Sequence, residues 1–141
     1  GHQLTSLALG GEISKLDIDV ALILGKHKTK ITPALKTQEE FISVFGKSYP
    51  QKEIYILRSH GYIVSTPPKG AIVLGSSQYG ENDIIKISDR VLTFQLHPEF
   101  TEKFIEYHII NRIYKNELIN MEYKEKILKN LYEEDILNQG K

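Results

Sequence analysis

A proline directly after a strand-like segment divides this sequence into two parts with different secondary-structure patterns. The segment Val91–Leu96 is short and rich in apolar residues, which is typical of a β-strand. Pro98 cannot donate the next ladder hydrogen bond, so the strand has to end there. Most segments before Pro98 are strand-like, whereas apolar residues beyond it recur at helical spacing. The sequence therefore predicts a sheet in the first hundred residues and helices at the end.

Short apolar or β-branched segments predict the strands. Ile18–Leu24 and Thr29–Thr32 flank a basic stretch that we expect to form a solvated hairpin tip. A phosphate-binding patch at residues 26–30 is the other interpretation, but no glycine-rich nest accompanies it. The remaining predicted strands are Glu53–Leu57, Ala71–Gly75, Asp83–Ile87 and Val91–Leu96, and Asp89-Arg90 makes a tight link between the last two.

Helical spacing predicts four helices. The first occupies residues 1–10, is closed by Gly10-Gly11, and would have begun before Gly1, so the chain looks cut. The second comes after a capping-box spacing between Thr37 and Glu40 and ends at Gly46. The last two helices are expected within residues 101–114 and 121–136. We expect these two amphipathic helices to pack on the sheet, although a docking surface for a partner is an alternative.

Charge and composition limit the function classes. Lysine plus arginine equals aspartate plus glutamate at 18 each, so no net charge favours nucleic acid or an anionic membrane as a partner. No apolar run approaches the ~20 residues of a membrane span, and we expect a cytoplasmic protein. The 141 residues contain no cysteine, which excludes disulfides within them and leaves them without a thiol nucleophile.

The segment His97-Pro98-Glu99 places an imidazole and a carboxylate two residues apart at a strand end. A histidine can deprotonate a thiol or water near neutral pH, and a carboxylate on its other ring nitrogen would fix the tautomer. The alternative is structural: a strand-end histidine followed by a helix start, where Glu99 and Glu102 favour the positive end of the helix dipole. The motif alone does not separate the two.

Gly1-His2-Gln3 opens the first predicted helix. Backbone N–H groups at a helix start can face an oxyanion, and a glutamine side chain can recognise an amide or a carboxylate. Gly-His is also the remnant that a cleaved purification tag leaves behind.

The run Ser59-His60-Gly61-Tyr62 comes directly after a predicted strand. Gly61 would let a ligand approach the backbone closely, and Tyr62 would supply an apolar wall with a polar tip. A plain β-turn is the alternative. No metal site is expected, because the histidines do not fall at zinc-ligand spacings. They are His2, His27, His60, His97 and His108.

Taken in order, these segments resemble class I glutamine amidotransferases. The family has a nucleophile elbow of the form Gly-x-Cys-x-Gly-His-Gln and a later Gln-x-His-Pro-Glu. Gly1-His2-Gln3 through Gly10-Gly11 matches the segment after the family's cysteine, and residues 94–100 match the second signature. Between them, residues 59–62, 68–71 and 73–77 fall in the substrate-strand segment.

The resemblance implies a Cys-His-Glu triad in which His97 is the general base and Glu99 orients it. It also implies that Gln3 and the backbone at Ser59, Gly61 and Tyr62 hold glutamine or a γ-glutamyl group. The family's cysteine would lie two residues before Gly1, outside this sequence, so the chain alone should be inactive. No cofactor and no metal are implied.

The resemblance further implies an α/β, three-layered, flavodoxin-like fold with two C-terminal helices. Its largely parallel central sheet would be incomplete here and carry an antiparallel addition. Residues 1–141 would be the C-terminal part of one domain, with a core at 1–100 and a helical tail at 101–141. The expected partners are glutamine or a γ-glutamyl peptide, and an N-terminal segment of the parent protein that carries the nucleophile. A synthetase is the partner expected if the tail is a docking surface.

The layout is similar to stand-alone members of the family, including cytosolic γ-glutamyl peptidases, and favours hydrolysis of a γ-glutamyl amide over ammonia supply. A non-catalytic binding or regulatory protein is the alternative. The residues immediately before Gly1 would discriminate the two.

Overall fold

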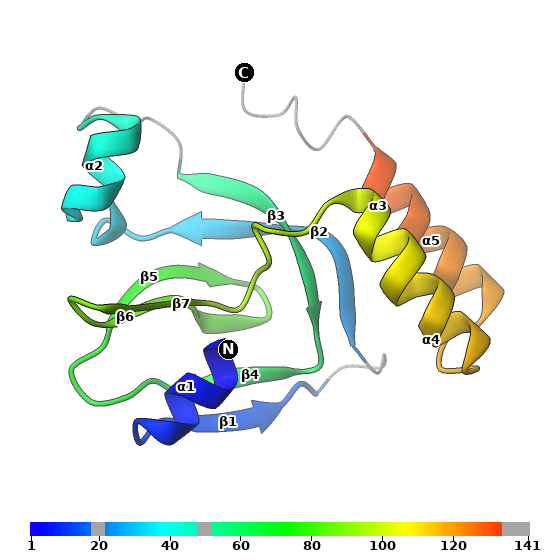
Figure 1. The fold of residues 1–141 in the computed structure, drawn as a ribbon, viewed down its shortest axis with the longest axis horizontal. Helices are drawn as coiled ribbons and strands as arrows, with labels where there is room; N and C mark the ends of the chain where they lie inside the picture. The colour runs from blue at the N-terminus through cyan, green and yellow to red at the C-terminus, as the bar shows by residue number, and fades with distance from the viewer. Residues whose placement is uncertain (18–21, 48–51, 134–141) are drawn as a thin grey trace.

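A computed structural model of the chain describes residues 1–17, 22–47 and 52–133. Five strands form one sheet in the order β3-β2-β5-β6-β7, and β1 pairs with β4 in a second, two-stranded sheet. Figure 1 shows α2 at one side of the sheets and the C-terminal helices at the other. The strands are β1 Glu12–Lys15, β2 Ile23–Ile31, β3 Glu53–His60, β4 Tyr62–Thr66, β5 Ile72–Ser77, β6 Gly80–Ser88 and β7 Val91–Phe94.

Every pairing between the described strands is antiparallel. The described residues therefore contain the antiparallel addition expected from the sequence, and the parallel pairings of a flavodoxin-like centre are not among them. β3 and β4 are separated only by Gly61, where the chain passes from the large sheet to the small one. The plain β-turn that was the alternative interpretation of residues 59–62 is not formed, since only Gly61 lies between the two strands.

The first predicted helix forms as α1 His2–Ala8, with Gly1 as its N-cap, and its glycine-closed end is confirmed. Its expected beginning before Gly1 stays a prediction. Gly10 has a φ of +91°, and the N–H groups of Gly10 and Gly11 donate to the carbonyls of Leu7 and Ser6. This pair of bonds is the Schellman arrangement, which satisfies carbonyls at the helix end and favours glycine.

The predicted hairpin tip at residues 26–28 is wrong, because β2 runs without interruption from Ile23 to Ile31. The ammonium group of Lys26 is buried and lies 3.1 Å from the carboxylate of Glu102. The side-chain amide of Asn130 bonds both the N–H and the C=O of Lys26, at 2.7 and 3.1 Å. Gly25 has a φ of +104°, and a Cβ there would stand 2.2 Å from the Asn130 oxygen. A contact across 104 residues thus replaces the expected turn.

The helix after Thr37 is confirmed, but its predicted capping box is wrong. Thr37 lies in a short 3-10 helix, Leu35–Thr37, and its hydroxyl donates to the carbonyl of Ala34 at 2.8 Å. The helix α2 Glu39–Phe45 has Gln38 as its N-cap, with no side-chain capping bond, and ends at Gly46 as predicted.

Two helical segments close the described chain, as the sequence predicts. The first consists of α3 Glu102–Phe104, a π-helix η2 Ile105–Ile110 and α4 Asn111–Lys115 without a break. The second is α5 Met121–Tyr132, capped by Asn120, and the last residues of its predicted range lie outside the described part. Among the described residues, none of the helices is both long and apolar enough to cross a membrane.

The C-terminal helices pack on β2 and β3, as the preference for intramolecular packing predicted, and together they build the larger of two hydrophobic clusters among the described residues. Its buried members are Leu24, Leu57, Ile105, Ile110, Ile127 and Leu131. Since a buried leucine or isoleucine contributes about 1.5–3 kcal/mol to stability, this cluster fixes the helical end firmly on the sheet.

Candidate active site

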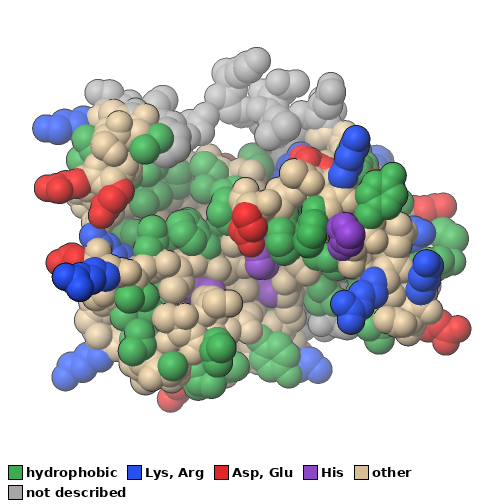
Figure 2. Space-filling view, in the orientation of Figure 1, with side chains coloured by type: hydrophobic (Ala, Val, Ile, Leu, Met, Phe, Trp, Pro, Cys, Tyr) green, Lys and Arg blue, Asp and Glu red, His purple; other side chains and the backbone are tan. Residues whose placement is uncertain are grey.

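The three candidate segments of the sequence meet in one pocket of about 320 Å³. Its lining includes residues 1–4 at the start of α1, residues 59–62 where β3 passes into β4, and residues 94, 95 and 97 at and just after the end of β7. His97 also lines an adjoining pocket together with Gly1, Pro98 and Glu99. Every sequence-predicted site residue therefore lies in one of these two pockets. Figure 2 shows histidine side chains in a hollow bordered by hydrophobic groups near the middle of this face.

His97 and Glu99 form a hydrogen-bonded pair at the end of β7. The His97 Nδ1 and the Glu99 Oε1 are 2.7 Å apart, and the two side chains are 30% and 61% exposed. Since a carboxylate can only accept, Nδ1 carries the proton and Nε2 is the basic nitrogen of the neutral ring. The hydrogen bond from His97 lowers the pKa of Glu99, so this carboxyl is ionised at neutral pH. The pair is arranged as a general base with its orienting carboxylate.

The backbone of His97 is fixed by its neighbour β3, because its N–H donates to the carbonyl of Leu57 at 2.9 Å. Leu57 and Leu96, which precede the two polar segments, are buried in separate hydrophobic clusters. His97 therefore stands on a firmly held segment after β7, although its side chain is partly exposed.

Gln3 uses its side-chain N–H groups within the pocket wall. It donates to the carbonyl of Tyr62 at 2.8 Å and to the Oε1 of Gln95 at 3.2 Å. The carbonyl of Tyr62 also lies 3.0 Å from the Nδ1 of His60. One carbonyl thus joins α1 to the segment between β3 and β4, and it fixes the relative position of two predicted substrate-binding segments.

His2 anchors the start of α1 to the sheet. Its Nδ1 lies 2.8 Å from the hydroxyl of Thr93, and its Nε2 lies 2.8 Å from the carbonyl of Asn82. The carbonyl requires a proton on Nε2, so Nδ1 accepts from Thr93. Burial lowers the pKa of His2, which favours this neutral form. His2 therefore has a structural role at the site, since both of its ring nitrogens contact strand residues.

His60 is buried beside the pocket. Burial lowers the pKa of His60 to about 4, so the ring is neutral at pH 7. Its Nδ1–H donates to the Tyr62 carbonyl, while its Nε2 has no hydrogen-bond partner among the described residues. The Nε2 of His60 is therefore buried, whereas the His97 side chain is 30% exposed.

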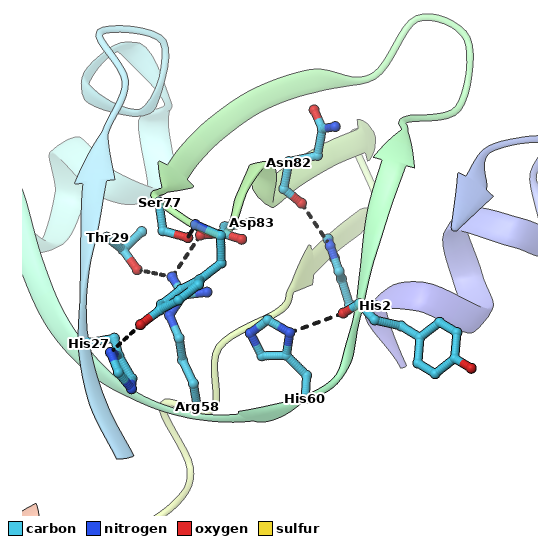
Figure 3. A network of polar contacts seen from close by, with 10 residues as sticks. His2, His27, Thr29, Arg58, His60, Ser77, Asn82 and Asp83 are labelled. Atoms are coloured by element: carbon cyan, nitrogen blue, oxygen red, sulfur yellow. Dashed lines mark hydrogen bonds and ion pairs between the residues drawn. The ribbon is translucent and has the colours of Figure 1, made fainter. Parts of the chain in front are cut away.

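Arg58 is the main feature that the sequence did not reveal. Its guanidinium is fully buried and lies 2.7 Å from the carboxylate of Asp83. The same Nη2 donates to the hydroxyl of Thr29. Figure 3 shows Arg58 within the curve of the sheet, between His27 on one side and His60 on the other. The polar groups expected to collect at the end of this strand are therefore divided: Arg58 is buried in the core, whereas Ser59 and the buried His60 line the pocket.

Two further residues of the site could have been found from the sequence. Gln95 belongs to the Gln-x-His-Pro-Glu signature, and Thr93 lies two positions earlier, on the same face of the strand. Both side chains are buried and contact α1, Thr93 through His2 and Gln95 through Gln3. Among the described residues, no three His, Asp or Glu side chains are grouped as a metal ion would need.

The chain matches one protein-family model and is similar in sequence to two curated plant proteins. The family model described as glutamine amidotransferase class-I matches residues 1–117. Gamma-glutamyl peptidase 2 of Arabidopsis thaliana is 27% identical over 115 residues, which cover 82% of this chain and 43% of that protein. Gamma-glutamyl peptidase 4 of the same plant is 29% identical over 113 residues, covering 80% and 42%. The chain thus spans less than half the length of these relatives.

Solved structures share the fold. A glutamine amidotransferase from Thermotoga maritima superposes with a TM-score of 0.63 at 17% identity, over 99% of this chain and 55% of that one. A putative GMP synthase subunit from Thermoplasma acidophilum gives 0.56 at 20% identity, over 71% and 45%. Together with the mixed helices and sheets of this chain, these likenesses establish the α/β amidotransferase fold that the sequence predicted.

Proposed function

The chain belongs to the class I glutamine amidotransferase family, and on that premise we propose that it supplies the base and the substrate pocket for hydrolysis of a γ-glutamyl amide bond. The nucleophile would be a cysteine on a preceding segment. The observation that carries the proposal is the His97–Glu99 pair, 2.7 Å apart, at the pocket that also contains Gln3, Gly61 and Tyr62.

The position of Gly1 supports a nucleophile that precedes it. Gly1 lines both pockets with His97. Two residues of extended chain span at most about 7 Å. A cysteine two positions upstream would therefore stand close to His97. β7 is at the edge of the described sheet, with Leu92 and Phe94 partly exposed, and offers a free edge to the strand that would carry this cysteine.

The chemistry follows from the tautomer of His97. Its Nε2 takes the thiol proton, and the thiolate attacks the γ-carbonyl carbon, forming a carbon–sulfur bond and an oxyanion. The carbon–nitrogen bond then breaks as Nε2 returns the proton to the leaving amine. Water, deprotonated by the same nitrogen, next attacks the thioester carbon; the carbon–sulfur bond breaks, glutamate is released, and the thiolate recovers its proton from Nε2. Throughout, Glu99 stabilises the imidazolium by accepting from Nδ1–H.

The γ-glutamyl moiety would lie along residues 59–62. Gly61 leaves the backbone accessible beside Ser59, and Tyr62 is 47% exposed, so its ring can cover an aliphatic chain. Gln3 is already bonded to Tyr62 and Gln95, so we assign it to shaping the pocket through its donors and leave its carbonyl oxygen for a substrate N–H.

A γ-glutamyl peptide is our preferred substrate, because both Arabidopsis relatives are gamma-glutamyl peptidases. Glutamine hydrolysis with ammonia passed to a synthetase is the second candidate. The structural neighbour described as a putative GMP synthase subunit is the observation that favours it.

The test is glutamate release by a polypeptide that continues upstream of Gly1 through the cysteine. We expect γ-glutamyl dipeptides to be cleaved with a higher kcat/KM than glutamine, and cysteine-to-serine replacement to abolish both reactions. Faster glutamine cleavage would reverse the substrate preference. An upstream residue other than cysteine would refute the catalytic proposal and favour a binding or regulatory protein, for which the lack of cysteine in these 141 residues is the supporting observation.

A further inference from the structure

The imidazole of His97 lies flat against the ring of Phe100. The ring centroids are 4.1 Å apart and the planes differ by 6°. A turn brings the two side chains together, since the Phe100 N–H donates to the carbonyl of His97 at 3.2 Å. Pro98, inside this turn, fixes one backbone angle and reduces the freedom of the segment. The contact is therefore a local feature of the chain after β7.

Phe100 is itself held from behind. It stacks at 4.6 Å on Phe104, which in turn lies 4.9 Å from the ring of His108. Phe104 and His108 are four apart on the helical segment that begins at Glu102, a spacing that places both side chains on one face, and Phe100 precedes this segment by two residues. Phe100 also packs against the core cluster that contains Ile105 and Leu57. The ring under His97 is thus the end of an aromatic ladder on the C-terminal helices.

The hydrogen bond to Glu99 does not fix the His97 ring by itself. Glu99 is 61% exposed, so water competes for the same acceptor, and the pair gains little from its charge. A single hydrogen bond also fixes only the direction of Nδ1–H, so the imidazole plane can still rotate about the axis of that bond. A second contact across the ring face defines the plane, and with it the direction of Nε2.

We propose that Phe100 is a positioning residue for His97: its stack holds the imidazole plane so that Nδ1–H meets Glu99 and Nε2 faces the pocket. The role of the C-terminal helices in the reaction is then to fix the base through Phe100. This inference rests on the proposed function only in calling His97 a base. The stacking and its effect on the ring exist whether or not the chain hydrolyses an amide.

The test is the tautomer of His97, read from ¹⁵N chemical shifts of the 141-residue chain at alkaline pH. In the wild type and in Phe100→Tyr, which keeps the ring, we expect the Nδ1–H form. In Phe100→Leu the ratio of Nδ1–H to Nε2–H should fall about two- to tenfold, the range that an aromatic stack contributes. Phe100→Met fills similar volume without a ring and should behave like Phe100→Leu, which covers the case that leucine impairs folding. Tyr107→Leu, an exposed aromatic on the same helical segment, is the matched control and should leave the ratio unchanged.

An unchanged ratio in both Phe100→Leu and Phe100→Met would overturn the proposal. An equal change in Tyr107→Leu would overturn it too, because general loosening of the helix would then be the cause. In a polypeptide that includes the nucleophile, Phe100→Leu should lower kcat with KM unchanged, and Phe100→Tyr should restore it. If that polypeptide is inactive while the tautomer shifts as expected, the proposed function fails and the positioning role stands.

Discussion

Two carboxylate pairs, one at the pocket and one in the core behind it, have the same distance between partner atoms but opposite exposure to solvent. Glu99 Oε1 lies 2.7 Å from His97 Nδ1, and Asp83 Oδ2 lies 2.7 Å from Arg58 Nη2. The side chains of His97 and Glu99 are 30% and 61% exposed, whereas those of Arg58 and Asp83 are 0% and 2% exposed. His60, two residues after Arg58, belongs to the buried side and lines the wall of the same pocket. Distance alone does not separate them, but exposure does.

The difference assigns different work to the two pairs. A base must meet its substrate and exchange protons, which requires an open nitrogen such as Nε2 of His97. A buried ion pair loses its hydration and compensates only partly by attraction, so it specifies how strands fit together and costs much if one partner is removed. The exposed pair is therefore expected to control activity with little effect on stability, and the buried network to control stability.

The largest effect should come from His97→Ala in the complete polypeptide. Removal of the base should lower kcat about 10³- to 10⁴-fold or more. The free energy of unfolding should change by only about 1 kcal/mol, since the side chain is partly exposed. Tyr107→Ala, at an exposed side chain outside the aromatic ladder, is the control and should keep full activity. A His97→Ala variant that keeps full activity would remove the distinction between the two pairs.

Asp83→Ala tests the buried side. It leaves the guanidinium of Arg58 buried and unpaired, which should destabilise the fold by about 3–5 kcal/mol in urea unfolding followed by circular dichroism. That is a large part of the stability of an ordinary domain, so the double variant Arg58→Met with Asp83→Leu is the companion measurement. This double variant removes both charges, and its free energy of unfolding should be much closer to that of the wild type. A single variant destabilised by less than about 1 kcal/mol would mean that the pair is not part of the core.

The exposed pair was predictable from the sequence and the buried one was not. His97, Glu99 and Gln3 belong to short motifs in which neighbours along the chain are neighbours in space. Arg58, Asp83 and Thr29 come from three strands, and only the strand order places them together. An arginine directly after an apolar strand segment carries no local sign of burial. The sequence therefore predicted the residues of the pocket more fully than the network behind it.

The same limit explains the errors in the fold. The basic stretch 26–28 is typical of a turn because lysine is usually exposed, yet Asn130 and Glu102 satisfy Lys26 from distant helices. Thr37 has the spacing of a cap, but its hydroxyl bonds within the preceding 3-10 helix. The helix α5 was predicted from its periodicity and β3 from its apolar run, although β3 extends three residues beyond the predicted Leu57. The division of the chain at residue 100 into core and tail stays a prediction.

Acid pH should reveal the buried histidine. The pKa of His60 is 6.5 without the fold and about 4 within it. Between these values the unfolded chain binds a proton that the folded chain does not, so stability is complete above pH 6.5 and is lost as the pH falls towards 4. The loss attributable to His60 should reach about 3 kcal/mol. Burial lowers the pKa of His2 and His27 as well, and both add to the loss in the same direction.

The measurement is the urea midpoint as a function of pH for the wild type and His60→Gln. The variant should lose less stability between pH 6.5 and 4 than the wild type does. Parallel curves for wild type and His60→Gln would show that His60 titrates normally. The loss of stability at acid pH could then not be attributed to the burial of His60.

The smallest expected effect comes from Glu99→Gln. The glutamine oxygen can still accept from Nδ1–H, but its amide can equally donate, so the preference for one tautomer and the stabilisation of the imidazolium are reduced. Because Glu99 is 61% exposed, water can replace part of its role, and kcat should fall only about ten- to hundredfold. Stability should stay within about 0.5 kcal/mol of the wild type. A loss of several kcal/mol in this variant would place Glu99 with Asp83 as a structural carboxylate. Full activity would mean that the Phe100 stack orients His97 without help from the acid.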